Sequence, residues 1–232
     1  MTLTDDRYGA PKVLDRVRGP RGESVLRQVD DRFEIISNGV FLMDTSDGAS
    51  ERLLVDAALA RCAAPRPRLL IGGLGVGFSL VRAVAREHVC AVHVVEIEAS
   101  VIDWHHRFLR HITGAALADP RVRVIPSDIL DWLRRTPDPY DAICLDTDNG
   151  PDWLVYESNA GLYTDEGMNL LARRLRPGGV LAVWCARPDP AYEQRLRTRF
   201  ADVEALTTPR PRGCPDVVYV AHGLGERPVM PG

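Results

Sequence analysis

The sequence predicts an α/β protein built around a largely parallel β-sheet, and three observations lead to this prediction. Strand-like and helix-like segments alternate from residue 68 to residue 200. The apolar run 69–71 leads directly into Gly73, Gly75 and Gly77, which precede residues with helical apolar spacing. A chain of 232 residues, 45% hydrophobic and 26% charged, can bury one such core. Repeated strand–helix units imply parallel strands with helices on both faces.

Composition argues against several classes of protein. The net charge of −3 gives no reason to expect nucleic acid or an anionic membrane as a partner. No apolar run approaches the length of a membrane span, and the polar start predicts no signal peptide, so we expect a cytoplasmic protein. The five cysteines lack paired spacing, and no His, Cys or Asp group has the spacing of metal ligands. We therefore expect neither a disulfide framework nor a metal.

The first 48 residues differ in pattern from the rest of the chain. Residues 1–22 are rich in Pro, Gly and Arg without a period, which predicts a mobile arm. Residues 23–48 predict a small β appendage, in which Asn38 and Gly39 form a tight-hairpin signal. The α/β domain is expected to occupy residues 49–232. Strands of the appendage are expected at 25–28, 32–36 and 40–43.

The α/β domain is expected to open with a helix at 50–63, capped by Ser50. The chain then alternates until a final antiparallel pair, 203–207 with 217–221, and it contains one long loop at 146–163. The other strands are expected at 69–71, 92–97, 122–125, 142–145 and 180–184, and the other helices at 79–87, 100–112, 127–135, 165–176 and 190–200.

Polar residues follow the strands at one edge of the predicted sheet. Glu96 ends the second strand, Ser127 and Asp128 follow the third, and the stretch from Asp146 to Asn149 follows the fourth. Ligands of open α/β sheets bind at this edge, and a glycine turn there allows close approach of the backbone. A carboxylate ending the second strand suits a ribose diol, and Asp128 suits an adenine amino group. The sequence therefore predicts a nucleoside pocket.

Each of these signals has a structural alternative. The glycines could serve a close-packed strand–helix corner, Asp128 could be only a helix cap with Ser127, and Asp146 could be only a turn former. The agreement of four strand ends favours the nucleoside pocket. A dinucleotide is disfavoured, because Phe78 stands where the Gly-x-Gly-x-x-Gly/Ala fingerprint requires a third small residue.

The loop 146–163 is expected to form the wall of a substrate site, since long loops in compact domains tend to be functional. Trp153 and Tyr156 could cover an apolar or cationic substrate, or could pin the loop to the domain. The histidines between 105 and 111 are expected to be surface or packing residues. The arginines between 195 and 199 are expected to form a solvated helix face.

A resemblance to a known family rests on five segments that span these strand ends. The first is Leu-Leu-Ile-Gly-Gly-Leu-Gly-Val-Gly at 69–77, and the others lie at 94–98, 127–133, 140–146 and 175–181. Together, the segments resemble the spermidine synthase-like branch of the class I S-adenosylmethionine-dependent methyltransferase superfamily. The resemblance implies a Rossmann-like, mostly parallel seven-stranded sheet with a short N-terminal β appendage.

The resemblance, joined to the strand-end argument, assigns expected roles to individual residues. The glycine turn would lie under the methionine and ribose part of S-adenosylmethionine, and Asp146 would face the reacting centre. The expected cofactor-binding residues are Gly73, Gly75, Gly77, Glu96, Ile97, Ser127, Asp128, Ile129 and Asp146. The expected catalytic residues are Asp146 and Asp148, and the expected substrate residues are Asn149, Trp153 and Tyr156.

The chain departs from the aminopropyltransferases of that branch at three places. Those enzymes have an acid in the glycine turn, where this chain has Gly75 or its neighbour Val76, and a second acid three residues after the counterpart of Asp146, where it has Asn149. Their Tyr-His pair is replaced by Leu54-Val55. A carboxylate in the turn would repel the carboxylate of intact S-adenosylmethionine, so its loss removes one reason to prefer the decarboxylated form.

We therefore expect an S-adenosylmethionine-dependent transferase that most readily transfers a methyl group to a small-molecule amine or hydroxyl, releasing S-adenosylhomocysteine. The sulfonium is already activated, so the protein mainly aligns the nucleophile, and Asp146 or Asp148 would orient or deprotonate it. The alternatives are an aminopropyltransferase that uses decarboxylated S-adenosylmethionine, and a non-catalytic nucleoside-binding scaffold. The expected partner is a small-molecule acceptor, without nucleic acid or membrane, and a homodimer is also among the expectations.

Overall fold

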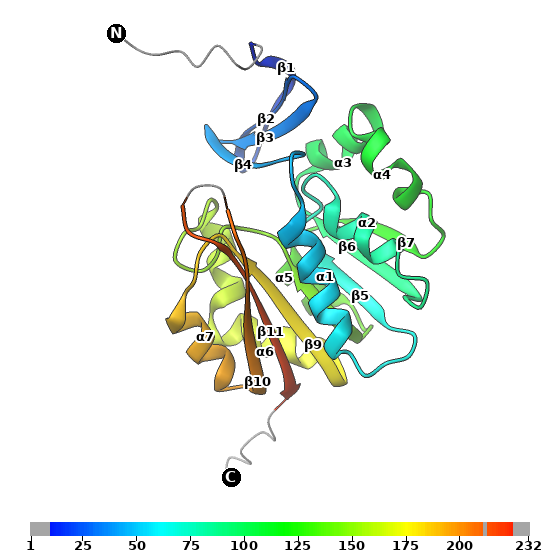
Figure 1. Ribbon diagram of the computed structural model, residues 1–232, viewed down its shortest axis with the longest axis vertical. Coiled ribbons are helices and arrows are strands. Elements are labelled where there is room, and N and C mark those ends of the chain that lie inside the picture. Colours follow the sequence, from blue (N-terminus) through cyan, green and yellow to red (C-terminus); the bar gives the residue numbers. More distant parts are fainter. Residues whose placement is uncertain (1–9, 211–212, 225–232) are drawn as a thin grey trace.

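The computed structural model describes residues 10–210 and 213–224, and their strands form two separate sheets (Figure 1). The smaller sheet is antiparallel with its strands in chain order, and the larger has the order β10-β11-β9-β8-β5-β6-β7. The smaller sheet consists of β1 (Lys12–Gly19), β2 (Gly22–Val29), β3 (Arg32–Ser37) and β4 (Val40–Asp44). The larger consists of β5 (Arg68–Gly72), β6 (Ala91–Glu96), β7 (Val122–Pro126), β8 (Tyr140–Leu145), β9 (Leu175–Cys185), β10 (Phe200–Thr208) and β11 (Asp216–Leu224).

The larger sheet confirms the predicted α/β class. Five neighbouring strands pair in parallel, in the order β9-β8-β5-β6-β7. Beside β9, β11 and then β10 add antiparallel strands. Every residue of β8 is buried, as expected for a parallel strand covered on both faces. The helical elements are α1 (Ala49–Arg61), α2 (Phe78–Val84), α3 (Ala99–Arg107), α4 (Arg110–Leu117), α5 (Ile129–Arg135), the 3-10 helix η1 (Glu157–Tyr163), α6 (Asp165–Arg174) and α7 (Pro190–Arg197).

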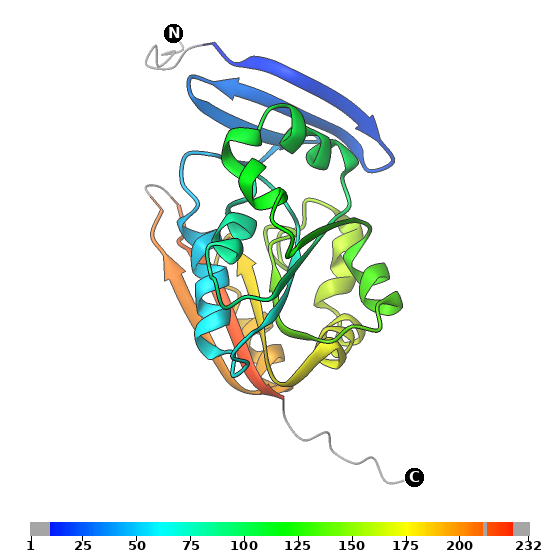
Figure 2. The ribbon, with the colours of Figure 1, turned by 90° about the vertical axis from the view of Figure 1, so that its right-hand side faces the viewer.

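Helices cover both faces of the larger sheet and divide its core into two clusters (Figures 1 and 2). On one face, α1 to α4 bury residues such as Leu54, Leu80 and Trp104. On the other face, α5, α6 and α7 bury residues such as Leu133 and Met168. The parallel strands therefore all end at one edge that neither layer of helices covers.

The N-terminal sheet lies at one end of the molecule, beside α3 and α4 (Figure 2). The indole Nε1–H of Trp104 donates to Asp15 Oδ2 at 2.9 Å, and Arg107 Nη1 donates to the same oxygen at 2.9 Å. Leu26 and Ile35 join the core cluster that contains α1 to α4. These contacts fix the small sheet against the α/β body.

One difference from the predicted N-terminal region stands out. Residues 12–19 form β1, although residues 1–22 are predicted to be a mobile arm; residues 1–9 of that arm lie outside the described residues. The strand is mostly exposed and rich in charge, so it carries little hydrophobic periodicity. The predicted hairpin at Asn38-Gly39 does join β3 to β4, with φ of 49° and 79°, as a type I′ turn requires.

Smaller differences concern helix ends. The predicted helix at 100–112 is two helices, α3 and α4, because the chain bends at Phe108 and buries Leu109 completely. The first helix is not capped by Ser50: its N-cap is Gly48, and Asp47 Oδ1 accepts from the N–H groups of Gly48 and Ala49. Ser50 is therefore the second residue of the helix and not its cap.

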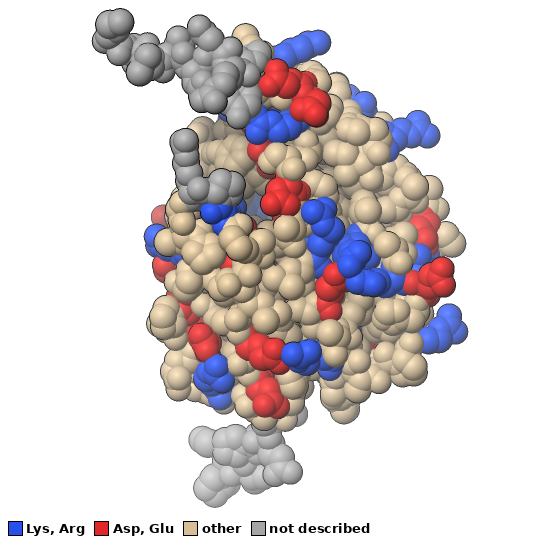
Figure 3. All heavy atoms as spheres, viewed as in Figure 1, with Lys and Arg blue, Asp and Glu red and all other residues tan. Residues whose placement is uncertain are grey.

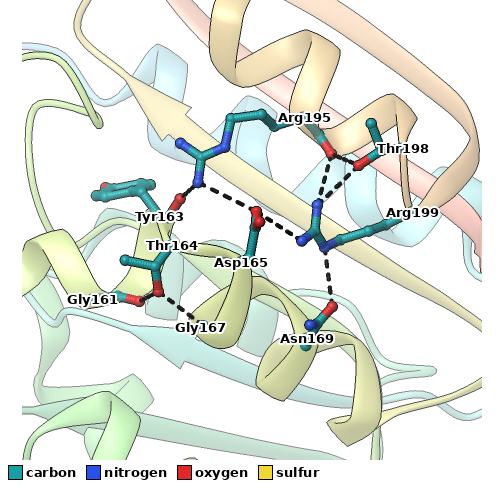
Figure 4. Close-up of polar contacts among 9 residues, drawn as sticks. All are labelled: Gly161, Tyr163, Thr164, Asp165, Gly167, Asn169, Arg195, Thr198 and Arg199. Atoms are coloured by element: carbon teal, nitrogen blue, oxygen red, sulfur yellow. Dashed lines mark hydrogen bonds and ion pairs between the residues drawn. The ribbon is translucent and has the colours of Figure 1, made fainter.

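Arg195 on α7 and Arg199 just after it anchor a neighbouring segment instead of forming a purely solvated face (Figure 4). Arg199 Nη2 lies 2.9 Å from Asp165 Oδ1, and Arg199 Nε donates to Asn169 Oδ1 at 3.1 Å. Arg195 donates to the carbonyl of Tyr163. These bonds tie α7 to η1 and α6, which follow the long loop after β8, and so hold the carboxyl-terminal end of that loop.

Among the described residues, no helix is both long and apolar enough to cross a membrane.

Candidate active site

A cavity of about 810 Å³ lies where the carboxyl edge of the larger sheet faces the N-terminal sheet. The space-filling view shows a hollow between these two parts, with acidic side chains beside it (Figure 3). The described residues that line the cavity include nine acidic side chains and only two arginines, Arg21 and Arg210. The lining of the cavity is therefore rich in acids. Its acids are Asp44, Asp47, Glu51, Glu96, Glu98, Asp128, Asp146, Asp148 and Asp216.

Most of the predicted site residues line this cavity. The structure brings eleven of the thirteen together, and Gly77 and Trp153 do not line it. Gly77 instead lies at the N-cap of α2 in the left-handed conformation. The eleven are Gly73, Gly75, Glu96, Ile97, Ser127, Asp128, Ile129, Asp146, Asp148, Asn149 and Tyr156.

The glycine turn connects β5 to α2, and two of its glycines have no room for a side chain. Gly73 has φ +91°, and a Cβ there would overlap the backbone carbonyl of Asp146. Gly75 has φ +51°, and a Cβ there would overlap the thioether of Met43 on β4. Gly73 therefore needs glycine because backbone atoms stand in the way, whereas at Gly75 the obstacle is the end of the Met43 side chain.

Glu96 holds the glycine turn in place through its carboxylate. The N–H of Leu74 donates to its Oε2 and the N–H of Glu98 donates to its Oε1, each at 2.8 Å. The side chain is 7% exposed, and burial raises the pKa of its carboxyl although both N–H groups act in the opposite direction. A carboxylate offers about four lone-pair sites, so two remain for hydroxyl groups in the cavity. Ribose binding by Glu96 stays a prediction.

Asp128 begins α5 and caps it. Its Oδ1 accepts from the N–H of Leu130 at 2.8 Å and of Asp131 at 3.1 Å. The helix-cap alternative for Asp128 therefore holds in the structure. Because Asp128 also lines the cavity, its second oxygen is compatible with the predicted contact to adenine.

Asp146 lies at the end of β8, next to the glycine turn. Its backbone N–H donates to Gly72 O at 2.8 Å, and its Oδ2 accepts from the hydroxyl of Ser79 at 3.3 Å. Burial, followed by the nearby charge of Glu51, raises the pKa of the Asp146 carboxyl to about 8. A carboxylate with a raised pKa can accept a proton near neutral pH, which suits a general base.

Asp148, predicted as a second catalytic carboxylate, holds the loop that follows. Its oxygens accept from the N–H groups of Asn149 at 2.8 Å and Val155 at 2.7 Å, and from Asn159 Nδ2 at 2.7 Å. The N–H of Tyr156 adds a longer contact of 3.3 Å. These bonds use most of its acceptor capacity, so Asp146 is the stronger candidate for a base.

The two aromatic residues predicted for the acceptor site lie in different places. Tyr156 lines the cavity, where its hydroxyl contacts Ser37 Oγ and its ring lies 3.7 Å under the guanidinium of Arg21. It thus pins the loop to the N-terminal sheet, which was the alternative considered for it. Trp153 is 48% exposed and lies beside Arg187, outside the cavity.

Three cavity residues near Asp146 were not predicted. Glu51 lies in the first turn of α1, Trp184 near the end of β9 and Asp216 at the start of β11. Trp184 Nε1 is fully buried and has no hydrogen-bond partner among the described residues. The sequence offered one signal for Asp216, since an antiparallel last strand starts at the edge where the parallel strands end.

His105 is a buried packing residue, in agreement with its prediction as a surface or packing residue, and it holds the glycine turn in place. It is 0% exposed, its Nε2 lies 2.9 Å from Gly75 O, and its Nδ1 lies 2.7 Å from Thr113 Oγ1. A carbonyl only accepts, so Nε2 carries the proton and Nδ1 accepts from the hydroxyl of Thr113. This pair of bonds fixes a neutral imidazole.

The buried His105 should make the protein less stable in acid. Burial, more than any other cause, lowers its pKa to about 4 from 6.5. In the unfolded chain, His105 binds a proton below about pH 6.5, whereas in the folded chain it does so only below about pH 4. The free energy of unfolding that is present above pH 6.5 is therefore lost as the pH falls from 6.5 to about 4. The loss should reach up to about 3 kcal/mol.

Urea unfolding at pH 7.5 and pH 4.5 tests this for the wild type, His105→Gln and the matched control His106→Gln, which alters an exposed histidine. The wild type and the control should lose more unfolding free energy in acid than His105→Gln does. An identical acid loss in all three proteins would contradict the assignment.

Within residues 10–210 and 213–224, no group of three or more His, Cys, Asp or Glu side chains is arranged to hold a metal ion. The acids of the cavity edge are separated by the glycine turn and by strand ends, and their described partners are N–H, hydroxyl and guanidinium groups.

The fold is that of the class I S-adenosylmethionine-methyltransferase-like superfamily. The chain resembles a spermidine synthase solved in complex with the transition-state analogue AdoDATO, with a TM-score of 0.76 and 18% identity over 92% of this chain and 75% of that one. A spermidine synthase from Thermotoga maritima gives a TM-score of 0.74 at 17% identity, over 92% and 74% of the two chains. The family model of the spermine/spermidine synthase domain matches residues 49–199. The chain belongs to that family.

Curated relatives in this family are aminopropyltransferases. Polyamine aminopropyltransferase 2 of Pseudomonas aeruginosa is 28% identical over 186 residues, which are 75% of this chain and 51% of the relative. Polyamine aminopropyltransferase 1 of Streptomyces coelicolor is 34% identical over 126 residues, 53% of this chain and 23% of the relative. The chain thus spans about half or less of the length of these relatives.

The comparisons correct the expected chemistry. Methyl transfer from intact S-adenosylmethionine was the expected activity, and it is wrong: the relatives and the matching family transfer aminopropyl groups. Aminopropyl transfer, the alternative considered, agrees better with these findings. The predicted family and seven-stranded fold are confirmed. Association into a homodimer and the assignment of individual site residues stay predictions.

Proposed function

We propose that this chain is an aminopropyltransferase, which moves the aminopropyl group of decarboxylated S-adenosylmethionine to an amine of a small polyamine. The observation that carries the proposal is the anionic cavity, in which nine acids face two arginines around Asp146. Decarboxylated S-adenosylmethionine and polyamines are both cations, so such a cavity attracts both. Family membership supports the same chemistry.

The donor molecule fits the chain's own residues. Gly73 and Gly75 line the cavity, and Glu96 keeps acceptor capacity beside them. Arg21 is the cation on this side of the cavity, and its Nε already lies 3.5 Å from Glu98. An intact cofactor would bring a carboxylate that finds few free cations here, whereas the decarboxylated form brings none.

The proposed reaction forms one bond and breaks one. The acceptor nitrogen attacks the propyl carbon beside the sulfonium, the carbon–sulfur bond breaks, and its electron pair neutralises the sulfur of 5′-methylthioadenosine. Asp146 takes the proton that the acceptor nitrogen loses and passes it to water. The chain otherwise aligns the two substrates in line, which supplies much of the rate.

Calorimetric titration tests which donor the cavity accepts. We expect decarboxylated S-adenosylmethionine to bind at least about tenfold more tightly than intact S-adenosylmethionine, because an unpaired carboxylate in an anionic cavity costs about 1.4 kcal/mol or more. As a control for the nucleoside that both donors share, 5′-methylthioadenosine is titrated in parallel, and it should bind as well. Tighter binding of the intact form would contradict the proposal.

A further inference from the structure

The side chain of Asp146 has one hydrogen-bond partner among the described residues, and this partner is Ser79. Ser79 Oγ lies 3.3 Å from Asp146 Oδ2. Ser79 is 3% exposed, and it is not one of the residues that line the cavity, whereas Asp146 is. A substrate in the cavity can therefore contact Asp146 but not Ser79, so that Ser79 can act on the reaction only through Asp146.

Strand order and the glycine turn place Ser79 beside Asp146. β5 and β8 are neighbouring parallel strands, and the N–H of Asp146 donates to Gly72 O at 2.8 Å. The turn that follows β5 ends at Gly77, which is the N-cap of α2. Ser79 is therefore the second residue of that helix, close to the strand end that carries Asp146.

The same hydroxyl faces a second acceptor, which belongs to α1. Ser79 Oγ lies 3.4 Å from the backbone carbonyl of Glu51, in the first turn of that helix. Two charge-assisted hydrogen bonds hold α2 against α1, because Asp56 accepts from Arg82 Nε at 2.8 Å and from Arg86 Nη2 at 2.6 Å. The hydroxyl and the carbonyl are therefore kept within reach of each other.

The hydroxyl of Ser79 has one proton for two acceptors. It can donate fully to only one of them at a time, and both of its O···O distances exceed the usual value of about 2.7–2.8 Å. An ionised Asp146 only accepts, so the hydroxyl then donates to it. When Asp146 Oδ2 carries a proton, it can donate to Ser79 Oγ, while Ser79 donates to Glu51 O. The arrangement therefore serves both charge states of Asp146.

We propose that Ser79 is the positioning residue of Asp146 and turns its hydroxyl from Asp146 Oδ2 to Glu51 O when Asp146 takes the proton of the acceptor amine. This inference rests on the aminopropyl transfer proposed above. The proton of the amine ends on Asp146, and Ser79 keeps its own proton throughout. Because a hydrogen bond to a charged acceptor is stronger than one to a neutral group, Ser79 favours the ionised form, which is the form that acts as a base.

The surroundings of Asp146 act against this hydrogen bond. Burial, above all, raises the pKa of the Asp146 carboxyl to about 8, and neighbouring acids act in the same direction, whereas the Ser79 hydroxyl lowers it. The titratable groups that face Asp146 are Glu51 on α1, Glu96 on β6, Cys144 on β8, Tyr163 on η1 and Asp216 on β11. Removal of the hydroxyl should therefore make Asp146 harder to ionise.

The pH profile of a Ser79→Ala variant tests the proposal, with decarboxylated S-adenosylmethionine and 1,4-diaminobutane as substrates. The acid limb of kcat/KM should move to higher pH by about 0.5–1 unit. Relative to the wild type at the same pH, kcat/KM should fall about three- to tenfold at pH 7 and less than about twofold at pH 9.5, where Asp146 is ionised in both proteins. A purely structural role would lower both values equally.

The matched control is Ser100→Ala, which alters the second residue of α3 and should follow the wild type at both pH values. Melting temperatures establish that each variant folds. A Ser79→Ala protein whose kcat/KM relative to the wild type is the same at pH 7 and pH 9.5 would overturn the proposal.

A double-mutant cycle shows whether Ser79 acts through Asp146. In an Asp146→Asn background, Ser79→Ala should change the remaining turnover at pH 7 by less than about twofold, because no carboxylate is left for the hydroxyl to hold. A further loss as large as the loss in the wild-type background would give Ser79 a role of its own and would contradict the proposal.

The titration of Asp146 can also be followed without turnover, by carbon-13 NMR of protein labelled at the aspartate carboxyl carbons. The signal of Asp146 is the one that is missing in Asp146→Asn. Its midpoint should lie about 0.5–1 pH unit higher in Ser79→Ala than in the wild type and should be unchanged in Ser100→Ala.

This titration separates failure of the inference from failure of the proposed function. If the midpoint moves in Ser79→Ala but no aminopropyl group is transferred by the wild type, the proposed function falls and the control of Asp146 by Ser79 stands. If transfer occurs and neither the midpoint nor the pH profile changes in Ser79→Ala, the positioning role is wrong and the function stands.

Discussion

An Asp146→Asn variant is expected to lose about 10²–10⁴-fold in kcat for aminopropyl transfer, as is usual when a general base is removed. Asparagine keeps the shape of the side chain and can still accept from Ser79, whose hydroxyl lies 3.3 Å from Asp146 Oδ2. It cannot take the proton of the acceptor amine. Turnover with saturating donor and diamine, measured as release of 5′-methylthioadenosine, checks the loss.

The pH dependence separates a base from a structural residue. Because the pKa of Asp146 is raised to about 8, kcat/KM should fall as the pH drops below that value and the carboxylate is protonated. The Asn variant should lack this limb of the profile, whereas the exposed control Asp202→Asn should keep it. A folded Asp146→Asn protein with near-normal turnover would leave the mechanism without its base.

A Glu96→Gln variant is expected to bind 5′-methylthioadenosine about 10–100-fold more weakly, equivalent to about 1.5–3 kcal/mol for a charge-assisted hydrogen bond. Both oxygens of Glu96 accept backbone N–H groups, from Leu74 and Glu98. In glutamine, one of these two oxygens is replaced by an NH₂ group, which cannot accept the hydrogen bond of the backbone N–H that it faces. The glycine turn under the donor should therefore loosen at the same time as the ribose contact weakens.

Calorimetry on the folded variant measures this effect, and Glu87→Gln at an exposed position is the matched control. The melting temperature reports how much of the change comes from the turn itself. An affinity equal to that of the wild type would place the ribose away from Glu96.

Much of the fold and the part of the cavity around Glu96 and Asp128 follow from local sequence. The strands ahead of Glu96, Asp128 and Asp146 are short apolar runs, and parallel strands bring their ends to one edge. The glycine turn has left-handed φ at Gly73 and Gly75, which other residues adopt only under strain. These features need no knowledge of distant contacts.

The part of the cavity around Glu51 and Asp216 could not be predicted in the same way. Glu51 belongs to the first turn of a helix, where an acid is ordinarily explained by the helix dipole. Asp216 reaches the cavity only because β11 inserts between β9 and β10, a matter of strand order. Asp148 resembled a catalytic acid in sequence, and only the hydrogen bonds show that it organises the loop.

These unpredicted acids explain why methyl transfer was expected. Gly75 and Asn149 lack the acids of related enzymes, which in sequence indicated a site with less negative charge. The structure shows that the cavity remains rich in acids, because acids from α1 and β11 line it as well. The loss of motif residues was therefore a poor measure of the charge of the site.

The mass of the acceptor after reaction tests the central claim most directly. Purified protein is incubated with decarboxylated S-adenosylmethionine and 1,4-diaminobutane, and the amines are analysed by mass spectrometry, with intact S-adenosylmethionine in a parallel reaction. We expect a diamine that has gained one aminopropyl group, and 5′-methylthioadenosine in equal amount, only with the decarboxylated donor. A diamine that gains a methyl group from the intact donor, with no aminopropyl product, would contradict the account.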